Sequence, residues 1–193
     1  MIAQIGRLVE VARQPVRTVG RHALGEVAGA ALLSLLVAIP GVLFSGVNPA
    51  AFEVLAFVAL VAILLMAALA DVGLIGSLTS DRQTPASWSC VLGSGLAPFA
   101  WGFHLGLVVL TRIPYQAVWG LLAFAVLSGS IIAAVAVLGT YGLVRGLTVA
   151  AVVARSPGGV SESCTRINAH ANQARIVVAG ASIGVAAIVV ATA

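Results

Sequence analysis

The chain has 193 residues, of which 61% are hydrophobic and only 8% are charged, and its mean hydropathy is +1.12. A soluble domain carries roughly half apolar and about a quarter charged residues. The 10 basic and 6 acidic residues are too few to cover a water-facing surface, which excludes an ordinary soluble domain. We therefore predict an all-α fold, a polytopic integral membrane helix bundle.

The first 22 residues predict an amphipathic helix at the membrane surface. Apolar residues such as Ile2, Ile5 and Val9 recur at steps of three and four with arginines between them, as in an interfacial helix. The charged region and the apolar stretch after it are both longer than in a cleavable signal, so we expect no cleavage. We predict a cytoplasmic segment over residues 1–22 and a single membrane domain over residues 23–193.

The spacing of charged residues predicts five membrane-spanning helices, because a helix needs about 20 apolar residues to cross a hydrocarbon layer of about 30 Å. The uncharged stretches number 26 residues after Glu26, 17 after Glu53, 29 after Arg82, 32 after Arg112 and 18 after Arg175. Apolar sequence continues beyond Asp71, so we expect the second helix to extend past it. The predicted spans lie at about residues 26–46, 53–76, 89–111, 117–143 and 175–193.

Two short segments mark the ends of these helices. Asn48 followed by Pro49 predicts a tight turn between the first two spans. The nine uncharged residues between Arg145 and Arg155 are too few to cross the membrane. We expect them to continue the fourth helix along the interface.

The distribution of arginines predicts the orientation, because basic residues favour the cytoplasmic side. With five spans and the N-terminus inside, nine of the ten arginines are cytoplasmic and only Arg112 is outside. Trp88 and Tyr141 then fall at the inner boundary, and Tyr115 and Trp119 at the outer one, where aromatic side chains prefer to lie. We predict a cytoplasmic N-terminus and a C-terminus outside.

The isoelectric point near 10.0 does not indicate nucleic-acid binding, because the arginines form no basic run and are not interleaved with aromatic residues. We expect the lipid bilayer as partner, with anionic headgroups at the cytoplasmic arginines. Cys90 and Cys164 are too isolated to predict a disulfide framework or a zinc site, and we expect His22 and His170 to lie in loops or juxtamembrane segments without acidic partners at ligand spacing. We therefore predict no metal and no cofactor.

Two ionisable residues, Asp71 and His104, lie inside predicted spans, where such groups are costly unless they are paired, wetted or used. The helical rise places them at different depths, so we do not expect them to pair. We expect Asp71 in the wet interface and His104 as a neutral imidazole bonded to a neighbouring helix, where Ser128 or Ser130 could reach it. The alternative is an ion or proton pathway.

Serine-bearing turns raise the question of an intramembrane hydrolase, in which Ser94 or Ser130 would be the nucleophile and His104 the base. Neither serine lies in a G-x-S-x-G motif. The simpler interpretation is that these serines and glycines let helices approach closely. We predict no catalytic residue.

The spacing G-x-x-x-G recurs along the chain and allows helix backbones to touch. We expect these pairs to pack helices within the chain, and as the alternative to form a face for a second copy or a membrane partner. The pairs are Gly25 and Gly29, Gly102 and Gly106, Gly142 and Gly146, and Gly180 and Gly184.

Residues 72–150 resemble the Yip1 family of membrane proteins. The resemblance lies in Trp88 followed by Val-Leu-Gly-Ser-Gly-Leu-Ala-Pro at residues 91–98, and in Tyr-Gly-Leu-Val-Arg-Gly-Leu at residues 141–147. The Asp-Leu-Tyr-Gly-Pro element of eukaryotic members is missing, so the resemblance does not extend to small-GTPase binding. It implies a non-enzymatic membrane scaffold for trafficking or membrane shaping, and it carries over no catalytic residue.

These observations predict a non-enzymatic, Yip1-like integral membrane protein that acts through helix packing with itself or with a membrane partner. The alternative is a small transporter or channel subunit that uses Asp71 and His104. A third hypothesis, an intramembrane enzyme, depends on the serines described above.

Overall fold

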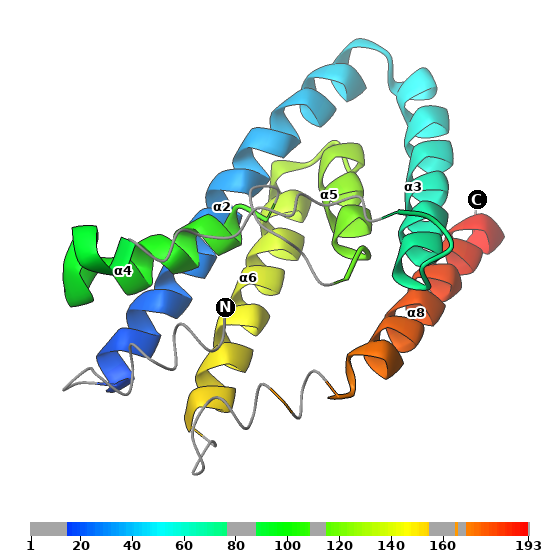
Figure 1. The fold of residues 1–193 in the computed structure, drawn as a ribbon. Helices are drawn as coiled ribbons and strands as arrows, with labels where there is room; N and C mark the ends of the chain where they lie inside the picture. The colour runs from blue at the N-terminus through cyan, green and yellow to red at the C-terminus, as the bar shows by residue number, and fades with distance from the viewer. Residues whose placement is uncertain (1–14, 77–87, 109–114, 155–164, 166–168, 193) are drawn as a thin grey trace. The chain divides into compact units, whose positions relative to one another are not determined.

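The structure, a computed structural model, describes residues 15–76, 88–108, 115–154, 165 and 169–192, which are helices and the turns that join them (Figure 1). No strand occurs within these ranges. The helices are α2 (Pro15–Val47), α3 (Pro49–Asp71), α4 (Trp88–Gly106), α5 (Val118–Leu127), α6 (Ile131–Ala154) and α8 (Ala171–Thr192). The prediction that Cys90 and Cys164 form neither a disulfide framework nor a zinc site falls outside the described residues. Cys164 is not among them, and nothing is described of the Cys90 side chain.

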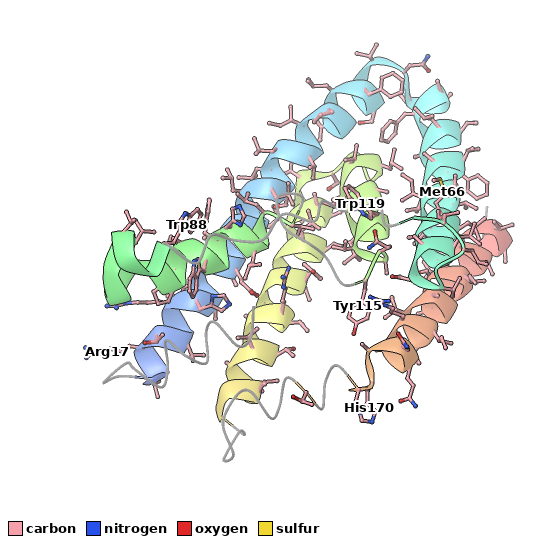
Figure 2. All side chains as sticks on the ribbon, in the orientation of Figure 1. Arg17, Met66, Trp88, Tyr115, Trp119 and His170 are labelled. Atoms are coloured by element: carbon pink, nitrogen blue, oxygen red, sulfur yellow. The ribbon has the colours of Figure 1, made fainter. Side chains whose placement is uncertain are left out.

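Four of the described helices are long and apolar enough to cross a membrane, which supports a multi-pass membrane protein. The four candidate spans are Val16–Val47, Pro49–Asp71, Ile131–Val152 and Ala171–Ala191. Many of their large apolar side chains are exposed; Met66, for example, projects from α3 and is 47% exposed (Figure 2). Lipid accommodates such surfaces and water does not.

The chain, which the sequence analysis treats as one membrane domain, divides into two compact units. The first unit combines Met1–Leu32, Asp81–Thr111 and Gly139–Ala171, so it contains the beginning of α2, α4 and most of α6. The second unit combines Leu33–Ser80, Arg112–Leu138 and Asn172–Ala193. It contains the rest of α2, α3, α5, the first turns of α6 and nearly all of α8.

The N-terminal helix differs from the prediction in its boundary. Residues 1–14 of the predicted amphipathic segment lie outside the described residues, whereas residues 15–22 are the first turns of α2 and continue directly into the first span. Pro15 is the first helical residue, where its fixed φ and missing N–H are tolerated. Thr18 and His22 are buried rather than surface-facing, because this part of α2 packs inside the first unit.

The second helix, α3, follows the predicted turn, but it begins at Pro49, before the predicted residue 53, and ends earlier than predicted. Asn48 caps it, since its side-chain oxygen accepts a hydrogen bond of 3.2 Å from the Ala51 N–H, and Pro49 opens the first turn. The expected extension past Asp71 is wrong. Gly73 adopts φ +81°, and the Leu74 N–H bonds back to the Leu69 carbonyl at 2.9 Å, which closes the helix in the manner of a Schellman motif.

The predicted span at 117–143 is not one helix. The structure breaks it into α5 and α6 at Gly129, whose φ of +59° belongs to the left-handed region that favours glycine. The Ser130 hydroxyl accepts a hydrogen bond of 3.3 Å from the Ala133 N–H and so caps α6. From there α6 continues to Ala154, which agrees with the expected continuation beyond Arg145.

The predicted span at 89–111 corresponds to α4, which is interrupted at Gly93 (φ 64°, ψ 173°) and ends at Gly106. The regular helix after Gly93 is therefore shorter than the about 20 residues that a crossing needs. α4 is not among the four candidate spans, and residues 109–111 lie outside the described part of the chain.

Candidate functional site

In the first unit, α2 and α4 touch backbone to backbone at their glycines. A Cβ at Gly25 or Gly29 would overlap the carbonyl oxygens of residues 99 and 103 on α4. In return, a Cβ at Gly102 or Gly106 would overlap the carbonyl oxygens of residues 22 and 26 on α2. Two of the predicted G-x-x-x-G pairs therefore face each other, and any larger side chain would force the helices apart.

The third pair brings α6 against the neighbouring side of α2. A Cβ at Gly142 would lie 2.7 Å from the Ala30 Cβ, and one at Gly146 would lie 3.1 Å from the Ala23 Cα. Glu26 lies between these two alanines along α2, and its carbonyl oxygen would be 3.0 Å from a Cβ at Gly142. Glu26 is thus enclosed by glycine-lined contacts on both sides, one with α4 and one with α6.

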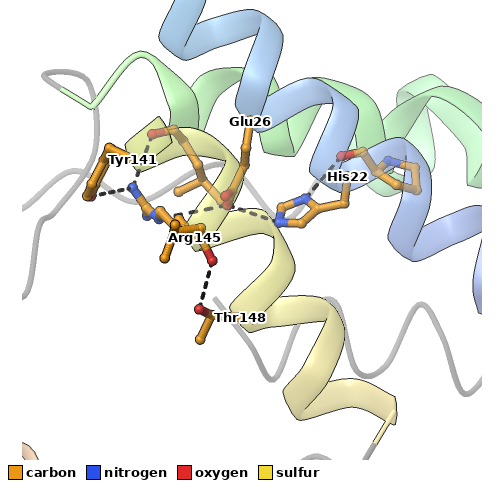
Figure 3. Close-up of polar contacts among 8 residues, drawn as sticks. His22, Glu26, Tyr141, Arg145 and Thr148 are labelled. Carbon is orange, nitrogen blue, oxygen red and sulfur yellow. Dashed lines mark hydrogen bonds and ion pairs between the residues drawn. The ribbon is translucent and has the colours of Figure 1, made fainter. Parts of the chain in front are cut away.

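Four polar side chains meet at this position, and we name them the Glu26 cluster: His22, Glu26, Tyr141 and Arg145 (Figure 3). The side chains of His22 and Glu26 are completely buried, and His22 Nε2 lies 3.2 Å from Glu26 Oε1. The two residues are four positions apart on α2, which places them on one face of the helix.

Arg145 reaches the cluster from α6. Its Nε lies 3.8 Å from Glu26 Oε1, and its side chain is 14% exposed. Its Nη1 donates hydrogen bonds to the Leu105 carbonyl at 3.2 Å and to the Tyr141 hydroxyl at 3.4 Å. The guanidinium carbon also lies 6.0 Å from the centre of the Tyr141 ring, within the range of a cation–π contact. One side chain of α6 thereby connects to α2 and α4.

His22 connects α2 to α4 independently of Arg145. Its Nδ1 lies 3.2 Å from the carbonyl oxygen of Pro98. A carbonyl oxygen can only accept, so Nδ1 carries a hydrogen and donates it. The other ring nitrogen, Nε2, makes no hydrogen bond to a described residue and lies 3.2 Å from Glu26 Oε1, so the expectation that His22 has no acidic neighbour is wrong.

The electrostatic character of the cluster follows from its burial. An ionisable group in a membrane span costs several kcal/mol unless it is neutral or compensated, and such groups mark functional positions by default. No cluster of three or more His, Cys, Asp or Glu side chains that could hold a metal occurs in the described ranges. The arrangement connects three helices of the first unit through polar contacts.

The two ionisable residues singled out from sequence, Asp71 and His104, belong to different units. Asp71 is buried at the end of α3, where its Oδ1 accepts a hydrogen bond of 2.7 Å from the Gln116 N–H. This contact and the burial correct the expectation of a wet interface. His104 on α4 lies against Trp88, with ring centres 5.3 Å apart and an edge-on angle of 72°.

The two serines considered as partners of His104, Ser128 and Ser130, have local partners in the second unit. The Ser128 hydroxyl donates to the Ala125 carbonyl at 3.2 Å and the Ser130 hydroxyl caps α6, both at the break between α5 and α6 in the second unit. Nothing is described of the Ser94 side chain.

The fourth glycine pair, Gly180 and Gly184, differs from the other three. A Cβ added at either position meets no atom of the described residues within 4 Å. The buried residues of α8 are Ala179, Ser182 and Ala186, which lie on the opposite face of the helix. This pair therefore presents an open, apolar face of small residues.

Charge counting overlooked the Glu26 cluster. It used Glu26 as the boundary of the first span, placed His22 outside the membrane and assigned Arg145 to a cytoplasmic loop. The overlooked signal was that His22 and Glu26 alternate with Gly25 and Gly29 along the sequence. Two ionisable residues four positions apart lie on one face of a helix, and a neighbouring G-x-x-x-G pair indicates that this face contacts another helix.

Comparison of the chain with protein-family models, with curated proteins and with solved structures gives no match, so the Yip1 resemblance stays a prediction from the motifs of the sequence.

Proposed function

We propose that the chain is a non-enzymatic, Yip1-like membrane protein that acts by packing its helices against a second copy of itself or a membrane partner. Its role would be of the trafficking or membrane-organisation type. The open face of α8 at Gly180 and Gly184 carries this proposal. The other three pairs of the same motif each contact a helix of this chain, so the motif serves as a helix contact here, and within the described residues one example is left without a partner.

We further propose the membrane arrangement of five crossings, with the N-terminus in the cytoplasm and the C-terminus outside. The four long apolar helices can provide four of the crossings, and the uncharged run of the sequence between Arg82 and Arg112 is the proposed fifth. The arginine distribution supports this orientation, because it leaves only Arg112 outside.

Substitution on the open face of α8 tests the packing function. Gly180→Ile combined with Gly184→Ile places branched side chains where a partner backbone would approach, so we expect self-association or partner capture to fall at least about tenfold, or ~1.4 kcal/mol. The measurement is crosslinking of the protein in membranes and its dissociation in detergent. Gly139→Ile is the matched control, because Gly139 also lies within a helix and a Cβ there meets nothing within 4 Å.

A protein that stays monomeric at every concentration, with no membrane partner recovered by crosslinking, contradicts this function. Equal effects of the α8 variant and the Gly139 control would contradict the assignment of the face to α8.

The second candidate function is a small transporter or channel subunit. One observation favours it: ionisable side chains of α2 are buried within a candidate span, where transporters place proton and ion pathways. The sequence analysis based the transporter hypothesis on Asp71 and His104. Measurement of ion or proton flux in proteoliposomes that contain the Asp71→Asn or the His104→Ala variant tests it. Unaltered flux in both variants removes these two residues from any pathway.

A further inference from the structure

We infer that the second unit contains a binding site for a primary ammonium group, carried by a lipid headgroup or by a free alkylamine, in a pocket beside the turn between α2 and α3 (Figure 1). This inference goes beyond the packing function and does not depend on it. The pocket has a volume of about 400 Å³, within the range of small-molecule sites. Its lining includes Ser45, Phe52, Glu53, Ala56, Ser128 and Gly129.

The break between α5 and α6 forms one wall of the pocket and is held in place by close contacts. A Cβ at Gly129 would lie 3.0 Å from Ser45 Oγ and 3.3 Å from Phe52 Cε1. A Cβ at Gly41 would overlap the Val126 carbonyl oxygen, so the backbones of α2 and α5 also touch. This wall is therefore fixed before a ligand arrives, which reduces the entropy lost on binding.

The hydroxyl groups that line the pocket already donate to the backbone. Ser45 Oγ donates to the Val42 carbonyl at 3.0 Å, and Ser128 Oγ donates to the Ala125 carbonyl at 3.2 Å. A serine hydroxyl has one hydrogen and two lone pairs, so each oxygen keeps at least one lone pair with which to accept. The third polar side chain of the lining is Glu53, whose carboxyl oxygens also accept. A ligand that satisfies these groups has to supply the donors.

The charge of the lining favours a cation. Glu53 is exposed and forms no ion pair within the described residues, and no basic residue belongs to the described lining. Phe52 adds an aromatic ring, and aromatic rings attract cations over their faces. A primary ammonium group carries positive charge and three N–H donors, which matches three acceptor side chains. A quaternary ammonium group has the charge but no donor, so it would leave the oxygens unpaired.

The pocket lies at the level where lipid headgroups meet the ends of spans. It is lined by the end of the candidate span Val16–Val47 and by the beginning of the next, Pro49–Asp71. A lipid with an ethanolamine headgroup would reach it from the bilayer, whereas a free alkylamine would reach it from water. Both carry the ammonium group on a short carbon chain, for which the lining offers the apolar side chains of Ala56 and Leu127.

Titrations of the full chain in detergent, followed by native mass spectrometry, test the inference with two pairs of probes. The lipid pair is dioleoyl-phosphatidylethanolamine and dioleoyl-phosphatidylcholine, and the soluble pair is ethanolamine and choline. In one pair or both, we expect the ethanolamine probe to bind at least about tenfold more tightly than its choline counterpart, because only the former donates to the lining oxygens. A preference within the lipid pair alone identifies a headgroup site, and a preference within the soluble pair identifies a site for free amines.

Substitutions in the pocket connect this preference to the site. Glu53→Gln removes the acidic group, and Ala56→Leu fills the pocket while keeping Glu53, so we expect each variant to lose the preference for the ethanolamine probe. Ala51→Leu is the matched control for Ala56→Leu. Ala51 is exposed on the same helix and outside the described lining, so this variant should keep the preference.

The wild-type protein alone can overturn the inference. Equal affinities for the ethanolamine and choline probes in both pairs, or no binding of any probe, contradict a primary ammonium site whether or not the variants fold. A preference that survives in either pocket variant, or that is lost equally in Ala51→Leu, contradicts the placement of the site in this pocket. Failure of the α8 crosslinking test would leave these affinities unchanged, so the two proposals fail separately.

Discussion

Arg145 is a residue that contacts three helices of the first unit. It contacts Glu26 on α2, donates to the Leu105 carbonyl on α4 and bonds to Tyr141 on its own helix. The planar guanidinium offers five N–H donors in a fixed geometry, so it serves several acceptors that a lysine ammonium could not reach together. Its role in the fold is to donate to the Leu105 carbonyl and the Tyr141 hydroxyl beside the buried Glu26 side chain.

Replacement of Arg145 by glutamine tests this role. We expect Arg145→Gln to lower the free energy of unfolding by about 2 kcal/mol, because the Leu105 carbonyl loses its side-chain donor and the Tyr141 contact is lost. Thermal unfolding in detergent measures the change. Arg175→Gln is the control, since Arg175 is exposed on α8, and its expected effect lies within about 0.5 kcal/mol. Equal losses in both variants would contradict the role.

At the scale of the elements, glycine spacing decides which helices of the first unit touch. The contacts between α2 and α4 involve backbone atoms of both helices, so a side chain larger than glycine on either helix would push the two helices apart. In lipid there is little hydrophobic gain from joining two helices, and close van der Waals contact supplies the association energy instead. A single added methyl group at one of these glycines is therefore enough to disturb the contact between α2 and α4.

A pair of alanine substitutions separates packing from helix propensity. Gly102→Ala places a methyl group on the His22 carbonyl oxygen, and we expect it to destabilise the protein by about 2 kcal/mol or more. Gly139→Ala adds the same methyl group in open space and should be neutral or stabilising by up to about 1 kcal/mol, because alanine is the better helix former. Unfolding measurements on both variants decide, and a neutral Gly102→Ala would refute the close crossing.

The sequence predicts the elements that depend on local signals. Uncharged intervals located α2, α3 and α8, and Asn48 with Pro49 located the turn between the first two helices. The break at Gly129 was missed, because Ser-Gly-Ser within an apolar run has no charge and resembles a packing motif. Its effect comes from a positive φ and a serine cap, which charge counting does not detect.

The Glu26 cluster could not be located from charge alone. Its members come from segments about 120 residues apart, and their meeting depends on the glycine contacts of α4 and α6 with α2. Charge counting treats each ionisable residue as the end of a span, which is correct for an isolated residue. A buried group with partners on neighbouring helices violates that assumption.

At the scale of the whole molecule, the four long apolar helices and the arginine distribution together set the membrane topology that we propose. We expect reporter fusions after residue 112 and after residue 193 to lie outside, and fusions after residues 21, 82 and 155 to lie inside. Phosphatase and fluorescent-protein fusions measure this. A C-terminus on the same side as the N-terminus would contradict five crossings and indicate that α4 does not cross.

The distance along the chain between Glu26 and Arg145 has a consequence for biogenesis. At roughly 5–20 residues per second, the ribosome needs on the order of 10 seconds to synthesise Arg145 after Glu26. During that interval the first helix must enter the membrane without the guanidinium neighbour of Glu26, and an unpaired carboxyl group in a membrane span is costly. Nascent chains stalled before residue 145 should therefore depend on insertase assistance or membrane proteolysis, and Glu26→Gln should relieve that dependence.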